Sequence, residues 1–224
     1  MARASENPRV RSFDLSSGAE ARLRNGDAPR AAILVNGGTG RRVPGTWSAT
    51  SEWLAEKLAP RYPGIAFLEV RYRTKSWHEL PSCMEDADAA LAAVGRPTIL
   101  VGFSMGGAVA IGVAGDDRVE AVLGLAPWIP DRLPLGGLAG KPFDVVHGAW
   151  DRWLPGVPGV SPRHSRAGFE RALAAGARGT YTLVPRGVHG VAVRSRRGRL
   201  LTLPGAHGWL EPACRALDCF SQAC

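Results

Sequence analysis

The stretch Thr98-Ile-Leu-Val-Gly-Phe-Ser-Met-Gly-Gly-Ala-Val-Ala decides the fold of this 224-residue chain. An apolar, β-branched run leads directly into Gly102-Phe103-Ser104-Met105-Gly106, and small residues follow with the composition of a helix. A serine at such a strand-to-helix turn adopts a strained backbone, and glycines two positions away on either side avoid collision with the neighbouring strand and helix. The spacing therefore predicts that Ser104 is a nucleophile held above a sheet at the N-terminus of a helix.

A serine nucleophile needs a base, and an imidazole base needs a carboxylate that fixes its tautomer. Downstream of Ser104, the apolar run at residues 143–147 is followed closely by Asp151, and the run at residues 180–184 is followed by His189. Serine, aspartate and histidine, each after a successive strand, form one of the chain orders in which this triad occurs. The order predicts a catalytic triad of these three residues.

Other residues compete for the roles of base and acid. His207 also sits in a glycine-flanked loop, and residues 191–203 could form a hairpin inserted before it. We favour His189 as the base because it follows the last strand at a short distance, whereas His207 is better placed to cap the terminal helix. His147 ends a strand and is interpreted as structural. Two acids are weaker candidates than Asp151 because of their positions in the strand pattern: Asp144 and Asp131.

The whole chain has the alternating pattern of an α/β protein. Short apolar runs alternate with amphipathic or Ala-rich stretches, which indicates βαβ units and a mainly parallel sheet. We expect strands at residues 31–36, 65–70, 98–103, 121–125, 143–147 and 180–184. We expect helices at residues 50–59, 105–114, 163–175 and 208–220, and a further helix that starts with a Ser82–Glu85 capping box.

The N-terminal part and the domain organisation complete this prediction. Residues 10–23 are expected to form an antiparallel hairpin at the edge of the sheet, and residues 1–9 a flexible N-terminus. No linker or internal repeat divides the sequence, so residues 1–224 are expected to form a single domain, as suits this length.

These motifs together resemble the α/β-hydrolase superfamily over roughly residues 31–220, most closely the serine esterases and dienelactone-hydrolase-like members without a cap domain. The resemblance rests on four segments: Asn36-Gly37-Gly38-Thr39-Gly40, GFSMGG around Ser104, HGAWDRWLP around Asp151 and GVHG around His189. It implies an α/β-hydrolase fold with a mostly parallel eight-stranded sheet and helices on both faces. It also implies Ser104 as nucleophile, His189 as general base and then acid, and Asp151 as the orienting carboxylate.

The resemblance also implies an oxyanion hole built from two backbone N–H groups. Met105, directly after the nucleophile, would supply one of them. The loop after Val35 would supply the other, through Gly38 or Thr39. The family loop usually begins His-Gly, whereas this chain has Asn36-Gly37. The departure is mild because the donor is an amide and not a side chain.

The expected pocket is open and rich in tryptophan. About 17 residues separate the strands ending near 126 and beginning near 143, too few for a helical cap, so we expect a minimal lid or none. Ligands of open α/β sheets bind beyond the carboxyl ends of the strands. Five tryptophans are expected at that edge, lining a pocket for a small acyl substrate: Trp47, Trp77, Trp128, Trp150 and Trp153.

The charge of the chain raises the question of an anionic partner. The formal net charge is +8, but only three of the 28 basic residues are lysines and the arginines are dispersed. No nucleic-acid recognition motif is present, so no nucleic-acid partner is expected. Seven cations are expected near the pocket and suggest an anionic substrate as a hypothesis: Arg41, Arg42, Arg71, Arg73, Lys75, Arg152 and Arg186.

Further expectations concern location and cofactors. No apolar run approaches the roughly 20 residues that span a bilayer, and no secretory signal is visible, so a cytoplasmic protein without a membrane partner is expected. No side-chain cluster has convincing metal-ligand spacing, so no metal or cofactor is expected. Cys214, Cys219 and Cys224 are expected to be reduced thiols, with a disulfide among them as the alternative. No oligomeric state is predicted.

The function predicted from the sequence is a serine hydrolase that cleaves carboxylic esters, lactones or thioesters through an acyl-enzyme. Two other functions stay open at this point. The same triad could transfer the acyl group to an acceptor other than water or cleave a peptide, or the fold could serve as a binding module without turnover. The last is disfavoured because all three triad residue types and both glycines beside Ser104 are present.

Overall fold

An eight-stranded sheet forms the centre of the computed structural model, which describes residues 10–151 and 159–222. The strands lie in the order β1-β2-β5-β3-β7-β8-β9-β10. Their bounds are β1 (Arg11–Asp14), β2 (Glu20–Arg24), β3 (Arg30–Val35), β5 (Ile65–Arg71), β7 (Thr98–Phe103), β8 (Val119–Leu125), β9 (Phe143–Gly148) and β10 (Tyr181–Val184). All neighbouring pairs from β5 to β10 are parallel, whereas β1 and β2 form an antiparallel hairpin at one edge. The predicted eight-stranded, mostly parallel sheet is confirmed.

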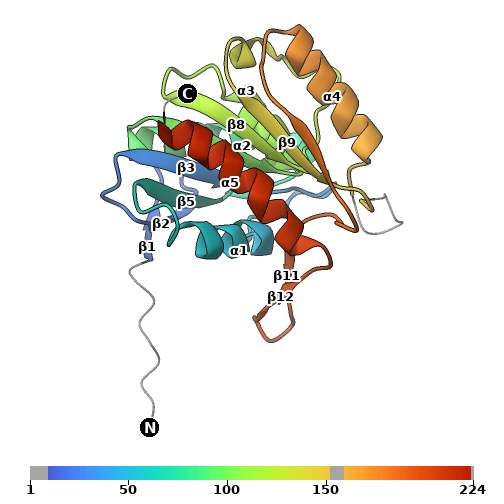
Figure 1. Cartoon of the computed structure of the whole chain (residues 1–224). Coiled ribbons are helices and arrows are strands. Elements are labelled where there is room, and N and C mark those ends of the chain that lie inside the picture. Colours follow the sequence, from blue (N-terminus) through green and yellow to red (C-terminus); the bar gives the residue numbers. More distant parts are fainter. Residues whose placement is uncertain (1–9, 152–158, 223–224) are drawn as a thin grey trace.

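Helices cover both faces of this sheet (Figure 1). One face packs against α1 (Ala49–Leu58) and α5 (Leu210–Gln222). The other packs against α2 (Leu80–Val94), α3 (Met105–Gly112) and α4 (Pro162–Ala174). Short 3-10 helices are η1 (Trp77–Glu79), η2 (Gly136–Leu138) and η3 (Ala206–Trp209). Two small ribbons pair β4 (Val43–Pro44) with β6 (Thr74–Lys75), and β11 (Ala192–Arg194) with β12 (Leu200–Thr202).

The apolar runs of the central strands create two hydrophobic clusters, one on each face. In β3, Ile33 and Val35 face the cluster under α2 and α3, while Ala32 and Leu34 face the cluster under α1 and α5. Because successive side chains of a strand point to opposite faces, a strand covered on both sides must be apolar throughout. Each fully buried aliphatic side chain contributes roughly 1.5–3 kcal/mol of transfer free energy.

The strand register brings the carboxyl ends of five strands to one edge. The paired residues near these ends are Val35 with Gly102, Phe103 with Leu125, Leu125 with Val146, and Gly148 with Val184. Because parallel strands end at the same edge, the loops that follow β3, β7, β8, β9 and β10 gather there. These loops carry the residues singled out in the sequence.

The capping box predicted at the start of α2 is wrong. The helix begins two residues earlier, at Leu80, with a proline in its first turn. Proline suits that position because its missing N–H would have no partner there. The side chains of Ser82 and Glu85 instead accept hydrogen bonds from Arg73, at 3.2 Å and 2.7 Å.

The segment between β8 and β9 carries no α-helix, in agreement with the expected absence of a cap. Its apolar side chains Ile129, Leu133 and Leu138 are buried against the core instead of standing over the sheet edge. In the described part of the chain, no helix is long and apolar enough to cross a membrane.

Candidate active site

Ser104 occupies a sharp turn between β7 and α3. Its φ of 55° and ψ of −119° lie in a region that non-glycine residues rarely adopt. Backbone hydrogen bonds fix this conformation: the Ser104 N–H donates to the carbonyl of Leu125 at 2.9 Å, and the Ser104 carbonyl accepts from Gly107 and Trp128 at 2.9 Å and 2.8 Å. The strained serine is thus tied to β8 and to the loop that follows it.

The two flanking glycines make this turn sterically feasible. A Cβ atom on Gly102 would lie 2.4 Å from the carbonyl oxygen of Gly106, and a Cβ on Gly106 would lie 2.3 Å from that of Val35. Both obstacles are backbone atoms, so they cannot move aside as a flexible side chain could. The steric reason expected from the sequence spacing holds in the structure.

Asp151 and His189 meet at the same sheet edge. The Nδ1 atom of His189 lies 2.6 Å from Oδ2 of Asp151, a short hydrogen bond across two loops. The Asp151 side chain is fully buried, whereas that of His189 is 18% exposed. The imidazole also packs on Phe103, with ring centroids 5.0 Å apart, and Phe103 directly precedes Ser104. The structure therefore brings Asp151 and His189 together and packs His189 on the residue that precedes Ser104.

The Asp151 carboxylate has a second histidine partner that the sequence interpretation did not assign to the site. His147 places Nε2 3.0 Å from the same Oδ2 atom and is completely buried. Burial acts to raise the pKa of Asp151, but the hydrogen bonds with His147 and His189 outweigh it and the pKa is lowered. The one signal in the sequence is that His147 lies four residues before the acid.

The loop after β3 is held in place by Asn36, which stands where the resembling family usually has histidine. Its Nδ2 group donates to the carbonyl of Thr46 at 2.9 Å, and its own carbonyl accepts from the Tyr72 hydroxyl at 3.2 Å. Its Oδ1 atom accepts the Gly37 N–H at 2.6 Å. The Gly37 amide is therefore already used within the loop.

Gly38, in the loop after β3, packs against Met105, the residue after Ser104. A Cβ on Gly38 would lie 2.1 Å from the Met105 sulfur, so the loop backbone packs directly on the residue after Ser104. Neither amide donates to another described residue. Thr39 does not line the pocket, and its hydroxyl and carbonyl bond to Arg41 and Trp77.

A pocket of about 300 Å³ opens above Ser104. Its described walls are Gly38, Trp77, Ser104, Met105, Trp128, Gly159 and Val160. Two of the five expected tryptophans, Trp77 and Trp128, are thus part of it. Gly159 and Val160 had no sequence signal, because they lie in an irregular loop between β9 and α4.

Trp47 and Trp150 are not among the described wall residues, and their contacts are with other parts of the structure. Trp47 lies under the guanidinium of Arg22, 4.0 Å from the ring centroid, and this cation–π contact draws it towards β2. Trp150 is 56% exposed, with its backbone N–H bound to Gly187 at 2.8 Å. Trp153 lies outside the described residues.

Three of the cations expected near the pocket are bound by other side chains, two of them by carboxylates. Arg71 pairs with Glu20, and Arg73 pairs with Asp86 at 2.7 Å as well as with Glu85. Lys75 donates to the Thr46 hydroxyl at 2.7 Å. No lysine or arginine is among the described residues of the pocket walls. Three of the predicted cations, Arg41, Arg42 and Arg186, are exposed, and Arg152 lies outside the described residues.

The rival histidine lies apart from this constellation. His207 is part of η3, and its ring packs edge-on against Trp53 of α1, with centroids 5.8 Å apart. It has no contact with Asp151 in the described structure. Residues 10–151 and 159–222 contain no group of three or more histidine, cysteine, aspartate or glutamate side chains suited to a metal ion.

Comparison with known proteins gives one family and many similar folds. A model described as "Alpha/beta hydrolase family" matches residues 32–220. The chain is similar to an alpha/beta hydrolase from a Medee basin deep-sea metagenome library, at 19% identity over 96% of this chain and 99% of that one (TM-score 0.68). It is also similar to a sugar hydrolase from Lactococcus lactis (19%, 94% and 97%, TM-score 0.70) and to the carboxylesterase Cest-2923 from Lactobacillus plantarum (18%, 94% and 96%, TM-score 0.62). Among curated proteins, no match was found.

Proposed function

Because this chain belongs to the alpha/beta hydrolase family, we propose that it is a serine hydrolase that cleaves carboxylic esters through an acyl-enzyme on Ser104. One observation carries the proposal: the 2.6 Å hydrogen bond between Asp151 and His189 lies next to Phe103, the residue before a serine in a strained turn that lines a pocket. A structural serine needs neither the strain nor the histidine–carboxylate pair. Strain of this kind is typical of functional sites.

In the proposed acylation step, the Ser104 hydroxyl attacks the ester carbonyl and His189 accepts its proton. The Nδ1–H of His189 donates to Asp151, which leaves Nε2 with the lone pair that a base needs. The ionised Asp151 then stabilises the imidazolium that forms. Collapse of the tetrahedral intermediate returns this proton to the departing alcohol.

The negative charge of the tetrahedral intermediate is assigned to the Met105 and Gly38 amides. The Met105 N–H lies at the N-terminus of α3, where the helix dipole also favours an anion. Removing one such donor typically costs about 100- to 1000-fold in turnover. Water then enters, His189 removes its proton, and the ester of Ser104 is hydrolysed.

The pocket favours a small and largely apolar acyl group. Its volume of about 300 Å³ is at the lower end of the range of small-molecule sites. Trp77 and Trp128 offer flat apolar surfaces, and the described walls carry no charge. We therefore propose short-chain or ring-bearing esters, lactones or thioesters as the substrate class.

Covalent labelling with a fluorophosphonate tests the proposed function. The wild-type protein should be labelled at one site, Ser104→Ala should not be labelled, and Ser221→Ala, which removes an exposed hydroxyl from α5, should be labelled like wild type. Hydrolysis of p-nitrophenyl esters of increasing length should then be fastest for short acyl groups. Equal labelling of wild type and Ser104→Ala would contradict the proposal, and an ester product with an added alcohol would indicate acyl transfer instead.

A further inference from the structure

His147, at the end of β9, holds a single polar atom between two acceptors. Its Nε2 lies 3.0 Å from Oδ2 of Asp151 and 2.8 Å from the carbonyl oxygen of Val160. The residue is wholly buried, so water does not compete for these contacts. Val160 lines the pocket above Ser104, and Asp151 is the proposed triad acid. One ring nitrogen thus touches both the pocket wall and the catalytic pair.

The chemistry of these contacts fixes where the proton of His147 lies. A carboxylate and a carbonyl only accept hydrogen bonds, so Nε2 must carry a hydrogen in order to satisfy either. The other ring nitrogen, Nδ1, is buried without a hydrogen-bond partner in the described structure. The polar contacts of this side chain are therefore concentrated on Asp151 and Val160.

Aromatic packing fixes the plane of the His147 ring. It stacks on Tyr181 of β10 with an interplanar angle of 15° and centroids 6.3 Å apart. Tyr181 is held in turn by a hydrogen bond from its hydroxyl to Pro162 at 3.0 Å and by the guanidinium of Arg166, 4.2 Å from the ring centroid. The stack opposes tilting of the ring out of this plane, and the contacts of Nε2 with Asp151 and Val160 fix which edge of the ring faces them.

The same carboxylate oxygen receives both histidines. Oδ2 of Asp151 lies 2.6 Å from His189 and 3.0 Å from His147, so the two donors jointly define the direction of the carboxylate. If one donor is lost, the carboxylate is free to rotate. It then no longer fixes the orientation of the His189 ring. A small displacement of a general base is costly, because proton transfer requires hydrogen-bond geometry.

We propose that His147 is a positioning residue that holds the Asp151 carboxylate for His189 and ties it, through the same N–H, to the Val160 wall of the acyl pocket. This inference rests on the proposed function and specifies how its triad acid is held. Hydrogen bonds to a carboxylate are stronger than those to a carbonyl. An acyl group that displaces the Val160 carbonyl would therefore leave the donor to Asp151.

Two substitutions separate the hydrogen bond from the shape of the side chain. His147→Phe keeps a flat ring but removes the donor, whereas His147→Gln can place an amide N–H near the position of Nε2. We expect the fluorophosphonate labelling rate of His147→Phe to fall about 10- to 100-fold, and that of His147→Gln to stay within about threefold of wild type. His207→Phe, next to Trp53, is the control for a histidine outside the site.

A pH profile of labelling gives a readout that loss of packing would not produce. The charged and titratable groups around His147 are Asp151, His189 beyond it, Tyr181, and Arg166 against the tyrosine ring. The hydrogen bond from His147 lowers the pKa of Asp151, so we expect its removal to raise that pKa. A more basic carboxylate binds the protonated imidazole beside it more strongly, which disfavours the neutral base that labelling requires. The acid limb of the profile should move to higher pH by about half a unit to one unit in His147→Phe.

A double-mutant cycle completes the test. If His147 acts through Asp151, His147→Phe should slow labelling strongly in the wild-type background and less than threefold in an Asp151→Asn background. Equal losses in both backgrounds, or a His147→Phe protein labelled at the wild-type rate, would overturn the inference. An unlabelled wild type would refute the proposed function itself. Thermal unfolding of each variant identifies slow labelling that comes from unfolding, and failure of His147→Gln to recover activity in a folded protein also counts against the inference.

Discussion

Close contacts between backbone atoms around Ser104 determine whether the chain can form the turn that presents the proposed nucleophile. The carbonyl of Val35 comes so close to Gly106 that no β-carbon fits between them, and β3 therefore packs against the very turn that presents the serine. The same contact brings the loop after β3, which includes Gly38, alongside Met105. At the scale of single residues, the glycines thus determine the position of the loop after β3 as well as that of Ser104.

This steric argument predicts the effect of a single methyl group. Gly106→Ala should lower the free energy of unfolding by about 3 kcal/mol or more, because the new Cβ would lie 2.3 Å from a backbone oxygen. Gly64→Ala, whose Cβ would have no neighbour within 4 Å, should change it by less than about 1 kcal/mol. Urea unfolding monitored by circular dichroism measures both. Equal midpoints for the two variants would refute the steric role of Gly106.

The choice between two histidines is also made at the residue scale. His189→Ala should reduce turnover of a short ester by about 1000-fold or more, because the serine loses its base. His207→Ala removes only an edge contact with Trp53 and should leave turnover within about threefold of wild type. Steady-state kinetics with matched enzyme concentrations, checked by active-site titration, decide between them. The reverse ranking would reassign the base to His207.

At the scale of elements, the sequence predicted what depends on local pattern. The alternation of apolar runs identified the central strands, and the order of Ser104, Asp151 and His189 followed from the loops after them. Each of these residues follows the carboxyl end of its strand. Parallel pairing brings the carboxyl ends of neighbouring strands to one edge of the sheet, whatever the details of side-chain packing. The sequence therefore predicts which loops come together at the site.

The sequence does not predict which distant side chain binds a given residue. Ser82 and Glu85 have the spacing of a capping box, but Arg73, from another part of the chain, binds both side chains. Trp47 has the position of a pocket residue, but Arg22, from the antiparallel hairpin at the edge of the sheet, attracts its ring. The position of His147 at the end of a strand predicts a structural role, because nothing local in the sequence shows that its Nε2 atom meets Asp151. Each outcome depends on where a distant side chain points.

The turn between α3 and β8 gives a prediction about pH. Arg118 donates to Asp116 at 2.6 Å and to the Leu91 carbonyl of α2 at 3.0 Å. These two hydrogen bonds connect the turn to α2. The hydrogen bonds from Arg118 lower the pKa of Asp116 to about 2 from its usual 3.8. A lowered pKa means that the ionised form stabilises the fold. This contribution is complete above about pH 4 and is lost as the pH falls through 2.

Asp116→Asn should therefore reduce the loss of stability between pH 4 and pH 2. At neutral pH the variant should be less stable by at most about 1 kcal/mol, because the ion pair is partly exposed to solvent. Asp117→Asn, a neighbouring exposed acid, is the control for the change in net charge. Urea midpoints at pH 7, 4 and 2.5 measure the effect. A steeper acid loss in Asp116→Asn than in wild type would contradict the sign of the argument.

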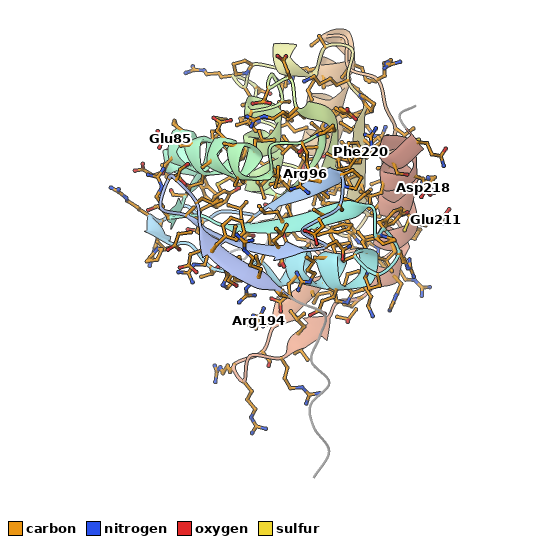
Figure 2. The ribbon with its side chains drawn as sticks, turned by 90° about the vertical axis from the view of Figure 1, so that its left-hand side faces the viewer. Glu85, Arg96, Arg194, Glu211, Asp218 and Phe220 are labelled. Atoms are coloured by element: carbon orange, nitrogen blue, oxygen red, sulfur yellow. The ribbon has the colours of Figure 1, made fainter. Side chains whose placement is uncertain are left out.

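At the scale of the whole molecule, the charge of +8 and the pocket are separate features. Charged side chains are distributed over many elements, and Figure 2 shows Glu85 on α2, Arg194 on the β11–β12 hairpin, and Glu211 and Asp218 on α5. Arg194 is itself bound to Glu52 of α1. The described walls of the pocket hold no charged residue. The field of the protein can attract anions from a distance, but the described walls offer an anion no cationic side chain.

This separation predicts how ester hydrolysis depends on salt. A neutral short ester should show a kcat/KM that changes by less than about twofold between low salt and 0.5 M NaCl, because nothing in its encounter or binding is electrostatic. An ester of the same length with a terminal carboxylate should lose about two- to fivefold over that range, since long-range attraction by the net charge is screened. At high salt, the kcat/KM of the carboxylate ester should not exceed that of the neutral ester. No cation in the described walls compensates for desolvation of the carboxylate. A carboxylate ester that stays the better substrate at 0.5 M NaCl would place a cation in direct contact with the substrate. Charge reversal at Arg41, Arg42 and Arg186, the exposed cations of the predicted rim, would then identify it.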